Sequence, residues 1–76
     1  NPVGNQAGVS FNLKNTEDVS AKLFSLDGSV AKELMNEKVN QGFCNRVFDM
    51  NNLSAGVYLL KLQVGDAYVT KKIVKE

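Results

Sequence analysis

Histidine and tryptophan are absent from this 76-residue chain, and cysteine and proline each occur once. The absence of histidine removes the commonest acid–base side chain and the commonest transition-metal ligand. The single cysteine, Cys44, excludes a disulfide within the chain and a zinc site built from several cysteines. Neither Cys44 nor any serine has an imidazole to activate it as a nucleophile. We therefore expect no cofactor, no metal ion and no enzymatic activity.

A strong charge of one sign and long apolar runs are missing as well. The net charge is +1, and no aromatic residues interleave with the basic cluster Lys71, Lys72 and Lys75. Nucleic-acid binding requires a dense phosphate-neutralising surface, so nucleic acid is not expected as a partner. No apolar run approaches the ~20 residues of a membrane-spanning helix, so no membrane span is expected. The opening segment 1–5 lacks the charged and apolar regions of a signal peptide, so if the parent protein is exported we expect its leader to lie upstream.

The chain does contain a repeated alternation of apolar and polar residues. Hydrophobic residues make up 43% of it, enough for a small folded domain of marginal stability. Period-two alternation predicts strands at 9–13, 19–23 and 58–63, and further strands are predicted at 43–50 and 68–74. Segment Val30–Val39 contains good helix formers, but its short length and strand neighbours favour a strand with an irregular or bulged middle.

Glycine-containing pairs between these strands predict hairpins. Asp27-Gly28 is typical of a two-residue turn with positive φ at both central positions, and Gly65-Asp66 predicts a second turn. Short strands and turns at near-regular spacing are typical of an all-β protein. We predict a small immunoglobulin-like β-sandwich of about seven antiparallel strands. It would be a single domain, with residues 1–8 as the end of a linker and residues 9–76 as the sandwich.

The run Asp49-Met50-Asn51-Asn52 superficially resembles a calcium loop. Leu53 and Ser54 stand where an EF-hand requires an oxygen ligand and a glycine, so an Asx-type turn is predicted instead. Asn52-Leu53-Ser54 matches a glycosylation sequon, but it coincides with the same turn.

Other single residues also have structural explanations. Cys44 is predicted to be a small buried side chain, with an intermolecular disulfide as the alternative. Tyr58 is predicted to lie in the core or at a corner of the sandwich, with its hydroxyl on a backbone partner. Gly56 is predicted to be required for its backbone dihedral, at a positive φ in a turn.

Several short segments occur in an order that resembles a known family. They are Asn1-Pro2, Val9-Ser10-Phe11-Asn12-Leu13, Phe24-Ser25-Leu26-Asp27-Gly28, Gly42-Phe43, Phe48-Asp49, Leu53-Ser54-Ala55-Gly56-Val57-Tyr58 and Lys71-Lys72-Ile73-Val74. In this order they resemble the type A C-terminal sorting domain on cargo proteins of the bacterial type IX (Por) secretion system. The chain departs from the family pattern at Ser29, where Arg or Gln is usual. It departs again at Arg46, where an apolar residue is usual, and a local shift of strand register would account for this.

The resemblance implies a function as a secretion signal. Such a tag would direct a folded cargo protein of a Bacteroidetes-type bacterium from the periplasm through the outer membrane, to the cell surface or the medium. Its partners would be the outer-membrane type IX translocon, a sortase-like protease that commonly removes the tag, and the parent cargo domain upstream. The residues implied in translocon recognition are Gly56, Val57, Tyr58, Lys71, Lys72, Ile73, Val74 and Lys75.

Other interpretations remain open at this point. Lysines on a terminal strand discourage edge-to-edge aggregation, which gives Lys71 and Lys72 a structural explanation beside recognition. The chain could instead be an immunoglobulin-like accessory module that binds carbohydrate or spaces domains in a surface protein, although the absence of tryptophan counts against carbohydrate stacking. Open strand edges permit either a monomer or a strand-exchanged dimer.

Overall fold

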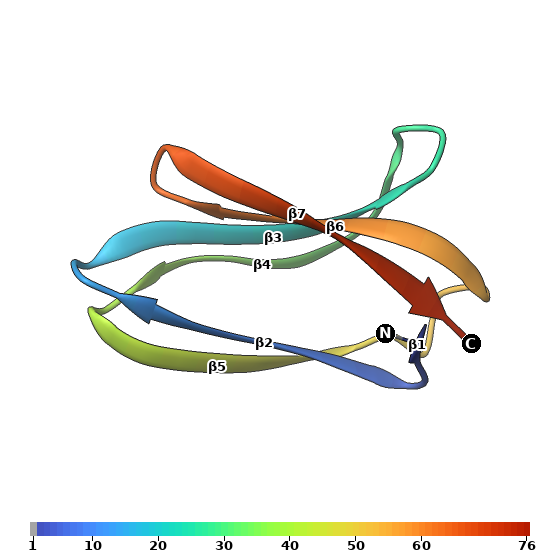
Figure 1. The fold of residues 1–76 in the computed structure, drawn as a ribbon, viewed down its shortest axis with the longest axis horizontal. Coiled ribbons are helices and arrows are strands. Elements are labelled where there is room, and N and C mark those ends of the chain that lie inside the picture. The colour runs from blue at the N-terminus through green and yellow to red at the C-terminus, as the bar shows by residue number, and fades with distance from the viewer. Residues whose placement is uncertain (1) are drawn as a thin grey trace.

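The computed structural model describes residues 2–76, which form strands and the turns between them (Figure 1). Two sheets pack face to face as a sandwich. The six long strands are β2 (Gln6–Leu13), β3 (Glu17–Ser25), β4 (Val30–Val39), β5 (Gly42–Asp49), β6 (Gly56–Val64) and β7 (Ala67–Lys75). The prediction of a small antiparallel β-sandwich is confirmed. Its strand count was slightly high, because the remaining strand, β1 (Pro2–Val3), has two residues and pairs in parallel with β7.

The two sheets differ in size. The larger sheet has five strands in the order β1-β7-β6-β3-β4, and the smaller sheet consists of β2 and β5. Pairing starts earlier in the chain than predicted, because β2 begins at Gln6 and Pro2 lies opposite Val74. Parts of the expected linker are therefore strand, while Asn1 lies outside the described residues. Over residues 2–76 there is no helix long and apolar enough to cross a membrane.

The core lies between the facing sides of the two sheets. Period-two alternation turns one row of each strand inward, so that apolar side chains from both sheets meet. The buried members are Ala7, Leu13, Val19, Ala21, Leu23, Met35, Val39, Cys44, Phe48, Met50, Tyr58, Leu60 and Ile73. Cys44 is buried among them as a free thiol, which confirms the prediction of a small core side chain.

The ambiguous segment Val30–Val39 is a strand with irregular pairing, as predicted. On β4 the ladder with β3 skips Leu34, between Met35 and Glu33, and it skips Ala31 a few residues away. Each skipped residue is a bulge, which adds twist and bends the strand locally. Helix propensity in this segment is overridden by pairing with β3 and by burial of Met35.

The predicted two-residue turn at Asp27-Gly28 is wrong. Gly28 has a φ of 93°, but no residue other than glycine has a positive φ in the described chain, so Asp27 does not. The Gly28 N–H donates to Ser25 O, and the Ser25 N–H donates to Ser29 O, which makes a longer loop. Asp27 Oδ1 accepts hydrogen bonds from the N–H and the hydroxyl of Ser29 at 2.9 and 2.7 Å. These bonds lower the pKa of Asp27, since they stabilise its charged form. The second predicted turn is confirmed, because β6 and β7 close around Gly65-Asp66 with Val64 opposite Ala67.

Candidate functional site

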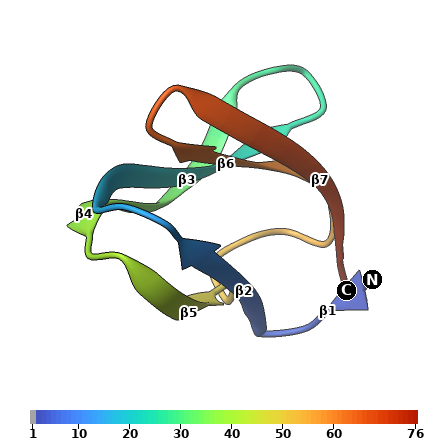
Figure 2. The same cartoon turned by 60° about the vertical axis from the view of Figure 1, so that its left-hand side comes forward.

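The residues predicted to act in recognition come together on one antiparallel ladder. β6 begins where β7 ends, so Gly56 lies opposite Lys75, Val57 opposite Val74, and Tyr58 opposite Ile73. Lys71 and Lys72 follow on β7, opposite Leu60 and Leu59. The two sequence segments that most resemble the family, at 53–58 and 71–74, are therefore neighbours in space. β1 pairs with the opposite edge of β7 at this same end (Figure 2).

Tyr58 and Ile73 form the buried side of this ladder, with 8% and 6% of their surfaces exposed. The hydroxyl of Tyr58 donates a hydrogen bond to the carbonyl oxygen of Ser54 at 2.6 Å. This bond ties the turn before β6 to the strand itself. The prediction of a corner or core tyrosine with a backbone partner is confirmed, and the role of Tyr58 in the structure is to hold the turn.

Gly56 has the positive φ that was predicted, although it is the first residue of β6 and not a turn residue. Its φ is 155°, and a Cβ added there would meet no atom within 4 Å. Glycine is therefore required at this position because of its backbone conformation and not because a side chain would be crowded. Glycine lets the chain leave the 50–55 turn and enter β6 directly opposite the end of β7.

Lys71 and Lys72 are the predicted recognition residues whose side chains a partner can best reach. Both are exposed, whereas Val57 and Val74 are half-buried on the outer face. Lys75 is 9% exposed, and its ammonium donates a hydrogen bond to the carbonyl oxygen of Glu76 at 3.0 Å. The inner and outer rows alternate along β7, so Lys71 and Lys72 point to opposite faces of the sheet.

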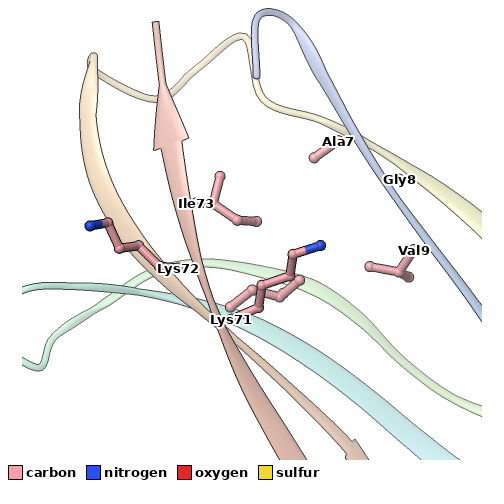
Figure 3. A pocket seen from close by; sticks show the side chains of 7 residues that line it. Ala7, Gly8, Val9, Lys71, Lys72 and Ile73 are labelled. Atoms are coloured by element: carbon pink, nitrogen blue, oxygen red, sulfur yellow. The ribbon is translucent and has the colours of Figure 1, made fainter. Parts of the chain in front are cut away.

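A hollow lies beside this ladder, between β7 and β2 (Figure 3). Ala7, Gly8 and Val9 line it from β2, and Lys71 and Ile73 line it from β7. Lys71 extends across the opening toward β2, while Lys72 points away from it (Figure 3). The β2 residues were not predicted as part of any site. No local signal could have found them, because they reach β7 only through the packing of two sheets.

The departure at Arg46 has a clear physical explanation. β2 and β5 pair without interruption from Gln6 opposite Asp49 to Leu13 opposite Gly42, so the expected register shift is wrong. Arg46 lies opposite Val9, on the inner row of β5, at the side of the sandwich where β5 lies near β4. Its Nη2 atom lies 2.6 Å from Glu37 Oε1 on β4, so an ion pair takes the place of an apolar contact between the two sheets. The hydrogen bond from Arg46 to Glu37 raises the pKa of the guanidinium.

The alternative sites in the sequence have structural roles. Asp49 Oδ1 accepts a hydrogen bond from the Asn51 N–H at 2.9 Å, which confirms the Asx-type turn. Across residues 2–76 no group of acidic, cysteine or histidine side chains is arranged to hold a metal ion. Ser29 and Lys32 stand at Ser-x-x-Lys spacing, but the Ser29 hydroxyl donates to Asp27 on an exposed turn. No nucleophile and base are brought together there.

The exposed aromatic residues of the described chain do not form a platform on which a carbohydrate could stack. Phe43 is 73% exposed on β5, and Tyr68 is 62% exposed on β7. Both side chains point outward from the sandwich, but from different sheets, since Phe43 pairs with Asn12 and Tyr68 with Gln63. Tyr68 is also covered in part by Lys61, whose ammonium lies 4.6 Å from the ring centroid.

Comparison with protein families is decisive. The family model of the secretion system C-terminal sorting domain matches residues 1–76. The chain belongs to this family. Sorting domains of this family are signals of type IX secretion, carried by cargo proteins bound for the cell surface or for secretion, and the family is not one of enzymes. Searches of curated proteins and of solved structures returned no match.

Proposed function

We propose that this sorting domain is read in its folded form by the outer-membrane translocon, through the ladder where β6 begins and β7 ends. The observation that carries the proposal is the meeting of Gly56–Tyr58 and Lys71–Lys75 on adjacent strands. Within this ladder Lys71 and Lys72 supply exposed charge, and Gly56, Tyr58 and Ile73 supply the shape that holds them. Recognition of a folded surface suits a cargo protein that has itself folded before it crosses the outer membrane.

The remaining steps of the proposal concern the fate of the tag. The cargo passes through the periplasm with the sorting domain attached, and a sortase-like protease removes the domain at the surface. The domain is a single unit that follows the parent cargo domain, and it has no catalytic role of its own.

A truncation of residues 71–76 would not test recognition cleanly. It removes the half of β7 that pairs with Gly56–Leu60, together with the buried side chain of Ile73. Such a variant would fail in export through unfolding alone. Substitutions of exposed side chains separate the two effects, because they leave the core and the backbone pairing in place.

The test is a fluorescent protein, exported to the periplasm, with this chain fused at its C-terminus in a bacterium that has the type IX system. We expect surface fluorescence that disappears in a strain without the translocon. The variant Lys71→Glu/Lys72→Glu should accumulate in the periplasm, because it reverses the exposed charge of the ladder. Its matched control is Lys14→Glu/Lys38→Glu, which makes the same change of net charge at exposed positions elsewhere.

Circular dichroism of the isolated domains checks that both double variants are folded. Periplasmic retention of the first and normal delivery of the second would support the ladder as the recognised surface. Equal delivery of both variants would remove Lys71 and Lys72 from recognition. Retention of the unmodified fusion, with its domain folded, would overturn the proposal.

A further inference from the structure

The hollow beside β7 continues as a groove along the open side of the sandwich. We call it the β2–β7 groove. Residues 7–10 of β2 line one side, Val69, Lys71 and Ile73 of β7 line the other, and Leu60 and Leu62 lie between them. The groove is distinct from the outer face of the ladder, where Lys72 projects (Figure 3).

The groove exists because the smaller sheet is too narrow for the larger one. Two strands, β2 and β5, face a sheet of five strands. The smaller sheet covers only part of the inner row of β7. Ile73, beside Ala7, is covered and 6% exposed, whereas Val69, on the same row, is 63% exposed. An inward-facing apolar side chain that is largely exposed marks the place where a further strand would complete the sandwich.

Hydrogen-bonding groups are available on both sides of the groove. β2 pairs with β5 and with no other strand of the described chain, so the edge that faces β7 is open. The outer edge of β7 is occupied by β1 at Val74 and Lys75, and residues 67–73 continue beyond that pairing. Open edges bind extended peptides through main-chain hydrogen bonds, while side chains at alternate positions determine specificity.

The charge of the groove indicates the chemistry of its occupant. The charged side chain that extends into the groove is that of Lys71, which is basic. Over residues 4–76 the structure has one salt bridge, between Arg46 and Glu37. Lys71 therefore has no carboxylate partner within this range. Lys71 extends into the opening between two apolar neighbours on its row, Val69 and Ile73. A strand that faces this row would place an apolar, an acidic and an apolar side chain at successive inward positions.

We propose that the β2–β7 groove is a docking site for an extended peptide strand of a partner protein, with the pattern apolar-x-acidic-x-apolar. The strand pairs with the open edge of β2 and becomes the third strand of the smaller sheet. Its apolar side chains cover Val69 and the Leu60–Leu62 floor, and its carboxylate pairs with Lys71. A second copy of this chain that joins β7 to β7 fits less well, because Lys71 and Lys72 of both copies would meet. The site does not depend on the secretion proposal, because it concerns what this chain binds and not where it is delivered.

The test measures binding of a labelled synthetic peptide to the 76-residue chain by fluorescence anisotropy. The peptide alternates threonine with valine, glutamate and valine, and its control has lysine in place of glutamate. We expect the glutamate peptide to bind and the lysine peptide to bind about tenfold more weakly or not at all. Lys71→Glu should reverse this preference. Lys38→Glu makes the same charge change at an exposed position on β4, outside the groove, and should leave the preference intact.

Amide hydrogen exchange locates the bound strand. Slower exchange in residues 7–10 on binding is expected if the peptide pairs with β2. Equal effects of Lys71→Glu and Lys38→Glu would mean attraction by net charge alone and would overturn the site. Slower amide exchange confined to β7, or a failure of both peptides to bind, would overturn the proposed site as well. Formation of a dimer when the peptide is added would be measured by light scattering. That result would mean that a second copy of this chain, and not a partner strand, occupies the groove.

Discussion

At the scale of single residues, the end of the ladder depends on two positions that fix the course of the backbone. Gly56 supplies a φ of 155°, and Tyr58 holds the preceding turn through its hydrogen bond to Ser54. Neither residue offers much side-chain surface to a partner, since glycine has no side chain and Tyr58 is buried. Their importance to sorting would therefore be expressed through the shape of the domain.

A valine at position 56 tests this conclusion. Gly56→Val should lower the free energy of unfolding by about 1 kcal/mol or more, because a β-branched residue is strained at this φ. For a domain of this size the melting temperature should fall by roughly 4–8 °C for each kcal/mol. The matched control is Gly4→Val, at an exposed position with open space and no positive φ, which should change little. Equal melting temperatures for Gly56→Val and the unmodified chain would refute the conformational role.

Residue-scale predictions from the sequence succeeded where the cause is local. The Asx turn at Asp49 and the hydroxyl bond of Tyr58 each join residues within four positions of one another. The turn at Asp27 was predicted wrongly because Asp-Gly also fits a longer loop with positive φ at the glycine alone. Choice between the two turns depends on how β3 and β4 pair, and the sequence pattern predicted an irregular strand without showing at which residues the bulges occur.

At the scale of elements, β4 and β5 show how an unusual residue is accommodated without a change of register. Arg46 takes an inner position on β5 and reaches across to Glu37 on β4. The two side chains are 39% and 48% exposed, so water screens the pair. The ion pair therefore joins the two sheets at the β4–β5 side of the sandwich but contributes little to stability.

A double-mutant cycle measures this contribution. Arg46→Ala, Glu37→Ala and the double variant should give a coupling free energy of ~0.2–1 kcal/mol in urea unfolding, as for exposed ion pairs. The coupling should decrease in 1 M salt, because the Debye length there is about 3 Å. A coupling several times larger, or one insensitive to salt, would mean that the pair is effectively buried in solution.

Element positions were predictable from the sequence, but partners were not. Alternation located strands such as β2, β3 and β6, because burial of one face imposes a period of two. The irregular strand at Val30–Val39 was predicted from its short length and its strand neighbours instead. Alternation could not show that β2 pairs with β5 or that β3 pairs with β6, since each pairing joins segments far apart in the chain. The groove beside β7 depends on these pairings, and for that reason its β2 side was missed.

At the scale of the whole molecule, Met50 links the local turns to the common core. It is 0% exposed, its N–H donates to Asn5 O at 2.8 Å, and its carbonyl oxygen accepts from the Leu53 N–H at 3.2 Å. The residue thus joins the entry to β2, the exit of β5 and the space between the sheets. A chain of this length has a total stability of only roughly 4–11 kcal/mol.

Truncation of this side chain should therefore affect the entire fold. Met50→Ala should destabilise the domain by about 2–5 kcal/mol through lost burial and a residual cavity. Met50→Leu, which keeps the volume, should cost less than about 1.5 kcal/mol. Both values can be measured by urea unfolding at equilibrium. A small loss for Met50→Ala would mean that the sheets close around the vacated space.

The pairing of β1 with the end of β7 has a consequence for the order in which the domain can be completed. Pro2 lies opposite Val74, so nearly the first and nearly the last residues of the chain share one ladder. A ribosome or a secretion channel releases Pro2 first and Val74 only after the intervening strands of the domain. The ladder cannot close until the final strand has emerged, and by then everything upstream has been delivered. Closure of the domain is thus a physical report that the chain has been delivered as far as the end of β7, available to any machinery that recognises the folded form.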